Sequence, residues 1–150
     1  MKHPEMLEFA RNTAKEAGNI LMKHFGHIDL IERKSTDIDL LTIADTESEA
    51  FILEKIHSLY PDHHIIAEES DLTEGNSDYR WVIDPLDGTT NFVHNLPIFA
   101  VSMGLQYNKE TILGVIYNPA ADKCFYAEKN GSAFLNGKSI HITSTNTLNS

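Results

Sequence analysis

Apolar side chains recur at intervals of three and four residues between Pro4 and Phe25, which is the spacing that lines one face of an α-helix. The residues on this face are Leu7, Ala10, Ala14, Ala17, Gly18, Leu21 and Phe25. Proline is tolerated in a first helical turn, and glycine is frequent just beyond a helix end. The pattern therefore predicts an amphipathic helix that runs from Pro4 to Phe25 and stops at Gly26.

A second helix is predicted to begin at Asp45 or Thr46. Thr46 and Glu49 have the spacing of a capping box, in which two side chains bond the free amide groups of a first turn. One apolar face then continues as far as Pro61 through Ile52, Ile56 and Leu59. We expect this helix to pack against the first.

The rest of the chain consists of short apolar or alternating runs, which are typical of β-strands. The predicted strands are 64–67, 80–83, 98–105, 111–117 and 123–128. Two Asn-Gly pairs, at 130–131 and 136–137, favour tight hairpin turns and hence antiparallel neighbours. Helices followed by strands predict an α+β layered domain, in which paired N-terminal helices pack on a mostly antiparallel sheet.

Composition and charge argue against nucleic-acid and membrane partners. The chain has 150 residues, 12 of them basic and 22 acidic, so its formal net charge is −10 and it repels a nucleic-acid backbone. Its apolar runs are far shorter than the roughly 20 residues that cross a bilayer. The single Cys124 cannot form an intramolecular disulfide. We therefore expect a cytoplasmic protein without membrane or nucleic-acid partners.

The densest group of polar residues is the segment 84–91, Asp-Pro-Leu-Asp-Gly-Thr-Thr-Asn, which follows a predicted strand. Asp84 and Asp87 lie three residues apart with Pro85 between them, so both carboxylates can face one divalent cation. The main-chain carbonyl of Leu86 offers a further oxygen ligand. The first half of the segment therefore has the ligand types of a Mg²⁺ site.

The second half of the segment has residues that suit a phosphate. Gly88 allows a close turn, and the amides and hydroxyls of Thr89, Thr90 and Asn91 can surround an anion at the start of a short helix. The same residue types also make ordinary turns and helix caps. Taken alone, the segment leaves both interpretations open.

A second acidic group favours the metal-site interpretation. Glu68 and Glu69 also follow a predicted strand, and neighbouring carboxylates repel each other unless water or a cation relieves them. One of the two could join Asp84 and Asp87 as a ligand.

Other known motifs fit less well. Counting from Asp84, the glycine is the fifth residue and the twelfth is Asn95, which excludes an EF-hand loop. The triplet Gly137-Lys138-Ser139 does not form a Gly-x-x-x-x-Gly-Lys-Ser phosphate loop, because Ser132 stands where that motif needs its first glycine. The Asp-x-Asp-Gly-Thr motif of haloacid dehalogenase phosphatases is similar, but the extra residue here redirects the second carboxylate.

Three other residue groups have ordinary interpretations. We expect Cys124 to be a small core residue and Trp81 a core aromatic. The histidines have no fixed spacing for a transition metal, so we expect solvated or capping roles for them. This group consists of His24, His27, His57, His63 and His64.

Three blocks of the sequence resemble, in order and spacing, the inositol monophosphatase family of Mg²⁺-dependent, lithium-sensitive sugar phosphatases. They are Lys34 to Asp45, Ala67-Glu68-Glu69-Ser70 and the stretch from Trp81 to Phe92. The similarity continues through residues 99–102 and 131–137, so it extends over essentially the whole chain. It implies a layered sugar-phosphatase fold and a phosphomonoesterase that hydrolyses inositol monophosphate or a related sugar phosphate.

The resemblance also implies roles for individual residues. The metal ligands would be Glu68, Asp84, Asp87 and the Leu86 carbonyl, with Asp84 bridging two of the two or three Mg²⁺ ions expected. Thr89 would position the attacking water together with Glu68.

The remaining roles concern the phosphate and the surroundings of the metal. The backbone from Gly88 to Thr90 would bind the phosphate. Lys34 and Asp45 would lie behind the ligands, although Asp45 suits a helix cap equally well.

Members of this family are about twice as long as the matching part. We therefore expect residues 1–150 to form an N-terminal metal- and phosphate-binding domain, with the later, substrate-selecting domain missing. Such a fragment could be inactive by itself, and the alternative function is a non-catalytic interaction module of the same fold. The resemblance also implies a homo-oligomer.

Overall fold

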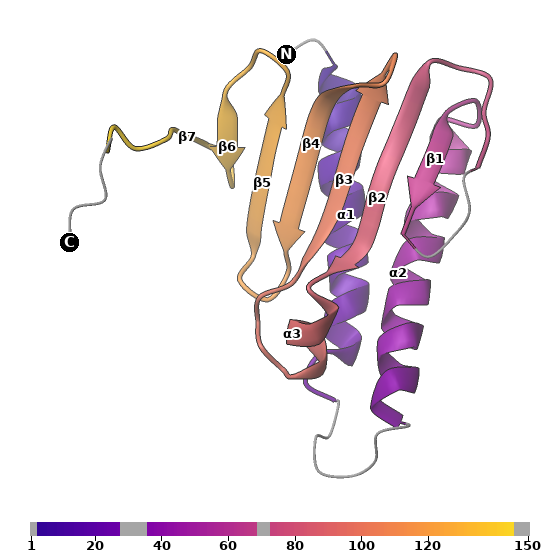
Figure 1. The fold of residues 1–150 in the computed structure, drawn as a ribbon, viewed down its shortest axis with the longest axis vertical. Helices are drawn as coiled ribbons and strands as arrows, with labels where there is room; N and C mark the ends of the chain where they lie inside the picture. The colour runs from indigo at the N-terminus through magenta and orange to yellow at the C-terminus, as the bar shows by residue number, and fades with distance from the viewer. Residues whose placement is uncertain (1–2, 28–35, 69–72, 146–150) are drawn as a thin grey trace.

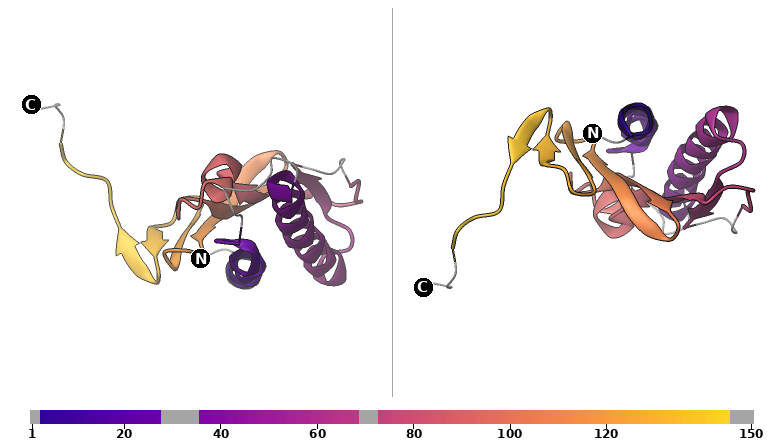
Figure 2. Two further views of the ribbon diagram at one scale, coloured as in Figure 1. Left: turned by 90° about the horizontal axis from the view of Figure 1, so that it is seen from below. Right: turned by 90° about the horizontal axis from the view of Figure 1, so that it is seen from above.

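Two long helices cover one face of a single β-sheet (Figure 1). The computed structural model describes residues 3–27, 36–68 and 73–145, and of residues 36–42 it describes only the helical backbone. The helices are α1 (Pro4–His24) and α2 (Thr36–Leu59). Viewed along the strands, both lie on the same side of the sheet (Figure 2). The expected layered α+β architecture is confirmed.

The described residues form a sheet of seven strands, which are hydrogen-bonded in their order along the chain. Strands β1 and β2 pair in parallel, and every later pair is antiparallel, as predicted. Their bounds are β1 His64–Ala67, β2 Tyr79–Asp87, β3 Ala100–Tyr107, β4 Glu110–Asn118, β5 Lys123–Glu128, β6 Ala133–Leu135 and β7 Lys138–Ile140. A short helix, α3 (Thr89–Val93), connects β2 to β3 at one end of the sheet (Figure 1).

Helix α1 buries the predicted face. Its small side chains allow a close approach to the sheet, and a Cβ atom on Gly18 would lie only 2.7 Å from the ring of Tyr117 on β4. The buried residues are Leu7, Ala10, Thr13, Ala14, Ala17, Gly18 and Leu21. The helix ends one residue earlier than expected, because Phe25 is already extended.

Helix α2 begins at Thr36, so the predicted start at Asp45 or Thr46 is wrong. Its fully buried residues recur every four positions: Ala44, Ser48, Ile52 and Ile56. This stripe already includes Ala44, which precedes Thr46. The stability gained by burying it in the helix exceeds the local preference of Thr46 and Glu49 for a helix start. Leu59, which was expected on the buried face, is 62% exposed.

Both Asn-Gly pairs lie in the predicted hairpin turns. Between β6 and β7, Asn136 and Gly137 have φ angles of 48° and 83°, the left-handed values that this tight turn needs. Asn136 also fixes the turn with its side chain, since it accepts a hydrogen bond from the Cys124 amide at 2.8 Å. The sequence signal and the observed turn therefore agree.

The sheet face opposite α1 and α2 is called here the open face, and no helix formed by the described residues covers its central strands (Figure 2). Its larger apolar side chains remain partly exposed: Ile66, Val82, Ile116, Phe125 and Ile140. Within the described residues, none of the helices combines the length and apolar character needed to cross a lipid bilayer.

Candidate metal and phosphate site

Asp84 lies near the end of β2, where the strand departs from regular pairing. The register with β3 shifts between Asp84 and Asp87, and the Leu86 amide turns back to donate a hydrogen bond to Asp84 Oδ1 at 3.1 Å. Asp84 pairs with Ser102, whose side chain is on the open face. The bulge therefore presents the Asp84 carboxyl group at the edge of that face.

Glu68 comes next to Asp84 because of the parallel pairing of β1 and β2. Ala67 is paired with Ile83, so the residues that follow them are neighbours at the same end of the sheet. Burial first, then the charge of Glu68, a hydrogen bond with the Glu68 side chain and the charge of Asp87, raise the pKa of Asp84 to about 7.

The donor set fits a hard divalent cation. A hydrogen bond between two carboxyl groups needs a proton between their oxygens, and a cation bound there would relieve the same repulsion. Within the described residues, however, no group of three or more acidic, histidine or cysteine side chains is already arranged to hold a metal ion. Glu68 and Asp84 are brought together, while Asp87 is exposed and acts on them only through its charge.

Helix α2 supports the irregular end of β2 from Asp84 to Asp87, called here the acidic loop. Ser48 is completely buried, and its hydroxyl donates a hydrogen bond of 3.3 Å to the carbonyl of Pro85. Asp45 lies one helical turn before Ser48 and inside α2, so the interpretation of Asp45 as a helix cap is wrong. Sequence analysis missed Ser48, whose only signal was a small polar residue within an apolar stripe.

Gly88 makes the turn from β2 into α3. Its φ angle is 91°, and a Cβ atom there would lie 2.9 Å from the carbonyl oxygen of Ile98. Both facts restrict this position to glycine. Thr89 and Thr90 then form the first turn of α3, where amide groups have no preceding helical carbonyl to bond.

Aromatic packing holds α3 in place. Phe92 is completely buried, and its ring lies 4.9 Å from that of Phe99 and 5.6 Å from that of Phe25. The Asn91 side chain donates a hydrogen bond of 2.7 Å to the carbonyl of Ile98. The turn at Gly88 is therefore anchored to both α1 and the start of β3.

The predictions for Lys34, Glu69 and Ser70 are not tested, because these residues lie outside the described residues. Trp81 is completely buried and Cys124 is 1% exposed, so both are the core residues that were expected.

The expectation for the histidines is wrong at His63. This residue is buried, and its Nδ1 accepts a hydrogen bond of 3.1 Å from the Trp81 indole. Its ring stacks between Tyr60 and Tyr79, with centroids 4.9 and 4.8 Å away. By contrast, His24 bonds Glu47 at the helix surface. Tyr79 and Trp81 are distant from His63 in sequence, so a local pattern could not predict this stack.

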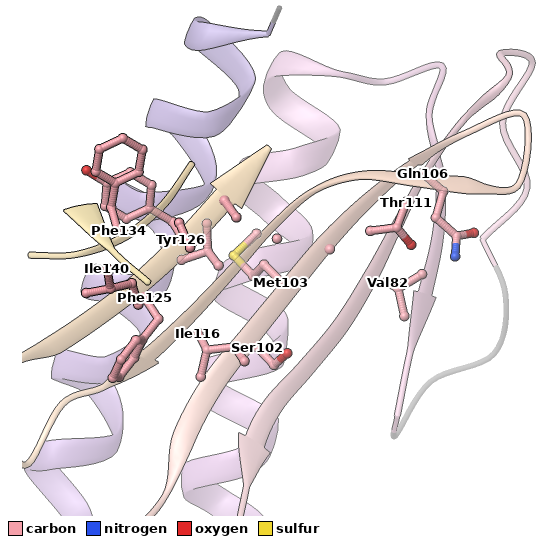
Figure 3. Close-up of a pocket in the computed structure, with 15 residues that line it drawn as sticks. Val82, Ser102, Met103, Gln106, Thr111, Ile116, Phe125, Tyr126, Phe134 and Ile140 are labelled. Atoms are coloured by element: carbon pink, nitrogen blue, oxygen red, sulfur yellow. The ribbon is translucent and has the colours of Figure 1, made fainter. Parts of the chain in front are cut away.

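A groove with a volume of about 440 Å³ lies on the open face, and the acidic residues do not line it. It extends from β2 to β7 (Figure 3). Val82 and Ser102 are at its edge nearest the candidate site, and Ile116 and Phe125 lie further along. Because Ser102 is the partner of Asp84, the groove and the acidic pair adjoin.

A family profile and individual relatives of known name both match this chain. The sequence profile described as the inositol monophosphatase family matches residues 2–150. A fructose-1,6-bisphosphatase/inositol-1-monophosphatase of Thermotoga maritima is 38% identical and aligns with 96% of this chain and 56% of its own length. The Nus factor SuhB of Haemophilus influenzae is 42% identical over 93% of this chain and 53% of its own.

Solved structures with a similar fold have related names. The extragenic suppressor protein suhB from Bartonella henselae superposes with a TM-score of 0.83 at 32% identity, over 93% of this chain and 55% of its own. The chain thus spans about half the length of the curated relatives it matches.

Proposed function

The chain belongs to the inositol monophosphatase family, and from this premise we propose that it supplies the metal- and phosphate-binding part of a Mg²⁺-dependent phosphomonoesterase. The observation that carries the proposal is the contact between Glu68 and Asp84 at the ends of two parallel strands. Neighbouring carboxyl groups provide the oxygen ligands that a divalent cation requires. The glycine turn beside them provides main-chain amides that can bind a phosphate.

Glu68, Asp84, Asp87 and the Leu86 carbonyl would hold Mg²⁺, and the resemblance implies two or three ions. Bound there, Mg²⁺ supplies Lewis acidity to phosphoryl oxygens and lowers the pKa of water. Asp84 is half-buried, and the Leu86 amide holds one of its carboxylate oxygens in place. Asp87 is exposed, so its side chain would have to turn toward Glu68 and Asp84 to bind the same cation.

The turn after Asp87 would bind the phosphate and orient the water. The amides of Gly88 to Thr90 are the proposed phosphate donors, because the turn is fixed by Gly88 and anchored by Phe92. The Thr89 hydroxyl, together with the Glu68 carboxylate, would accept hydrogen bonds from the attacking water and align it with the phosphorus. Attack by water leaves no phosphate attached to the protein.

Inositol monophosphate is the proposed substrate, and fructose 1,6-bisphosphate is the alternative that the name of the Thermotoga maritima relative raises. The test is release of inorganic phosphate from each compound, with Mg²⁺ and with EDTA. We expect release that requires Mg²⁺ and is lost in Asp84→Asn, whereas Asp78→Asn, before the start of β2, retains it. Release that persists in EDTA would contradict the proposal.

A non-catalytic function is the second candidate, and the relatives named Nus factor SuhB favour it. Such a chain would retain the fold and would bind a cation without turnover. Mg²⁺ binding without phosphate release, in this chain and in a version extended to the length of the relatives, would support it. Release in the extended version alone would instead assign the activity to the longer protein.

A further inference from the structure

A polar pocket with a volume of about 250 Å³ lies at the end of the sheet opposite α3, where β1 and β2 begin and β3 turns into β4 (Figure 1). We call it the basic pocket, because its lining contains more basic than acidic side chains although the formal net charge of the chain is −10. The lining residues are His64, Ser77, Asp78, Arg80, Asn108 and Lys109.

Arg80 has an unused donor in this pocket. It is half-buried at the start of β2 and pairs with His64 on β1, so both side chains project from the same face of the sheet. The Arg80 Nε atom is buried and has no hydrogen-bond partner among the described residues. A buried donor on a charged group costs free energy unless an acceptor reaches it. An oxyanion in the pocket would supply that acceptor.

His64 and Ser77 are arranged as hydrogen-bond donors. The Gly75 amide donates to His64 Nδ1 at 3.0 Å, so the proton of the neutral ring is on Nε2. The Tyr79 amide donates to Ser77 Oγ at 3.2 Å, which leaves the hydroxyl hydrogen for another acceptor. In both residues, the main chain occupies an acceptor atom and the donor stays available to a ligand.

Lys109 brings a second cation to the pocket in a strained turn. The φ angles of Asn108 and Lys109 are 50° and 67°, the left-handed values of a two-residue hairpin turn. Glycine is favoured at the second position of such a turn, as at Gly137 between β6 and β7. The Asn108 amide donates a hydrogen bond of 3.1 Å to the Asp78 carbonyl, which ties the turn to the start of β2. The turn itself therefore gives no reason for a lysine.

The two cations are not neutralised within the protein. None of the ion pairs formed by the described residues includes Arg80 or Lys109. The exposed carboxylate of Asp78 opposes an anion, but it offsets only one of the two positive charges. The basic pocket thus combines a net positive charge with several free donors.

We propose that the basic pocket binds a small phosphate monoester. The fork of an arginine matches the oxygens of a phosphate, and a monoester has a charge of about −1.5 to −2 near pH 7 that suits two cations. A carboxylate has only two oxygens and one charge for the same donors. The pocket is larger than a phosphate group, so it also has room for part of the esterified compound.

This site is separate from the acidic pair, Glu68 and Asp84. Arg80 precedes Asp84 on β2 by about 13 Å of strand. Its ligand groups are cations and neutral donors, so binding there requires no metal ion. The proposal therefore does not rest on the proposed function.

The test is an NMR titration with glycerol 1-phosphate and with inorganic phosphate, in EDTA and at constant ionic strength. The side-chain Nε–H signal of Arg80 reports on the unpartnered donor, and its loss in Arg80→Lys identifies it. We expect this signal to shift and to saturate, with the ester binding at least as tightly as inorganic phosphate. Arg80→Lys should weaken binding by about 10-fold or more, as measured from the main-chain amide of Lys109, because lysine cannot form the fork.

Lys109→Gly separates ligand binding from folding. Glycine suits the φ angle at this position, so the change should raise the melting temperature by a few degrees. It should also weaken binding of the ester by about 3-fold or more, because a cation is lost. Lys123→Gln removes the same charge at an exposed position on β5 and should leave the affinity unchanged.

The proposal is wrong if the Arg80 signal does not move with phosphate, or if chloride moves it equally. Shifts confined to the amides of residues 88–90 would place phosphate at the candidate site alone. Equal weakening in Lys109→Gly and Lys123→Gln would mean that overall charge, and not the pocket, accounts for binding. These measurements need neither Mg²⁺ nor turnover, so their failure leaves the proposed function untouched.

Discussion

At the scale of single residues, burial raises the pKa of Asp84 and lowers the pKa of His63, which lies inside an aromatic stack. The first lies at the edge of the open face, and the second lies within the protein. Each can be tested by a single substitution with a matched control.

Asp84→Asn should weaken Mg²⁺ binding by about 10-fold or more, because even residues behind a metal ligand cost 10- to 100-fold when they are changed. Asp78→Asn makes the same change just before the start of β2 and should have little effect. Isothermal titration calorimetry with Mg²⁺ measures both. Equal affinities of the two variants would remove Asp84 from the site.

His63 should make the folded state less stable in acid. Burial lowers the pKa of His63 from its ordinary value of 6.5, an effect that His64 reinforces and Asp62 opposes. Below this value the unfolded chain binds the proton more readily than the folded chain, so the free energy of unfolding decreases as pH decreases.

The measurement is urea unfolding between pH 7.5 and pH 5. The Gln side chain can still accept the bond from Trp81 but does not titrate, so His63→Gln should flatten the pH dependence. His57→Gln, at an exposed position on α2, should not. A pH dependence that is unchanged in His63→Gln would show that this residue does not cause it.

At the scale of elements, close packing of helices against the sheet determines where the site residues lie. Gly18 lets α1 approach β4, and Ser48 connects α2 to the acidic loop. Neither residue touches a ligand. Both act by fixing the position of a neighbouring element.

Gly18→Ala should destabilise the fold by about 1–3 kcal/mol, because the added methyl group would overlap the Tyr117 ring. This cost exceeds the gain of about 1 kcal/mol in helix propensity. Asn19→Ala, at the exposed neighbouring position, should be neutral or stabilising. Urea unfolding compares them, and an increase in stability for Gly18→Ala would contradict the packing argument.

Ser48→Ala should cost about 0.5–1.5 kcal/mol of stability through the lost hydrogen bond to Pro85. It should also lower Mg²⁺ affinity, but by less than Asp84→Asn, because the loop loses support while keeping its ligands. Ser58→Ala on the exposed side of α2 is the control for both readouts. A loss of stability with unchanged Mg²⁺ affinity would limit Ser48 to a structural role.

The sequence predicted elements better than their ends and their contacts. The helical periodicity of α1 and the Asn136-Gly137 turn were read correctly, because both signals are local. The start of α2 was predicted wrongly, because the burial of Ala44 is a tertiary effect that a local pattern does not show. The contact of Glu68 with Asp84 likewise depends on parallel pairing, which a local pattern cannot specify.

At the scale of the whole molecule, the two faces of the sheet are unequal. One is covered by α1 and α2, and the other exposes apolar side chains around a groove. Exposed apolar surface of this kind favours association. The behaviour of the chain in solution should therefore depend on the open face more than on any other surface.

Replacing Ile116 and Phe125 by Thr should reduce binding of the dye ANS several-fold and suppress association at high concentration, with little loss of thermal stability. Ile142→Thr is the control, since Ile142 is 97% exposed but lies beyond β7. Fluorescence titration and analytical ultracentrifugation provide the measurements. Equal effects of the two changes would show that the open face is not responsible.

The order of the strands has a consequence for how the chain is made. Because each strand from β2 onward pairs with the one before it, a newly synthesised strand finds its partner already outside the ribosome. Short sequence separations between partners also favour fast pairing. The sheet can therefore grow during translation, one strand at a time, and the residues of the candidate site, all within 68–90, are in place before β4 to β7 are added.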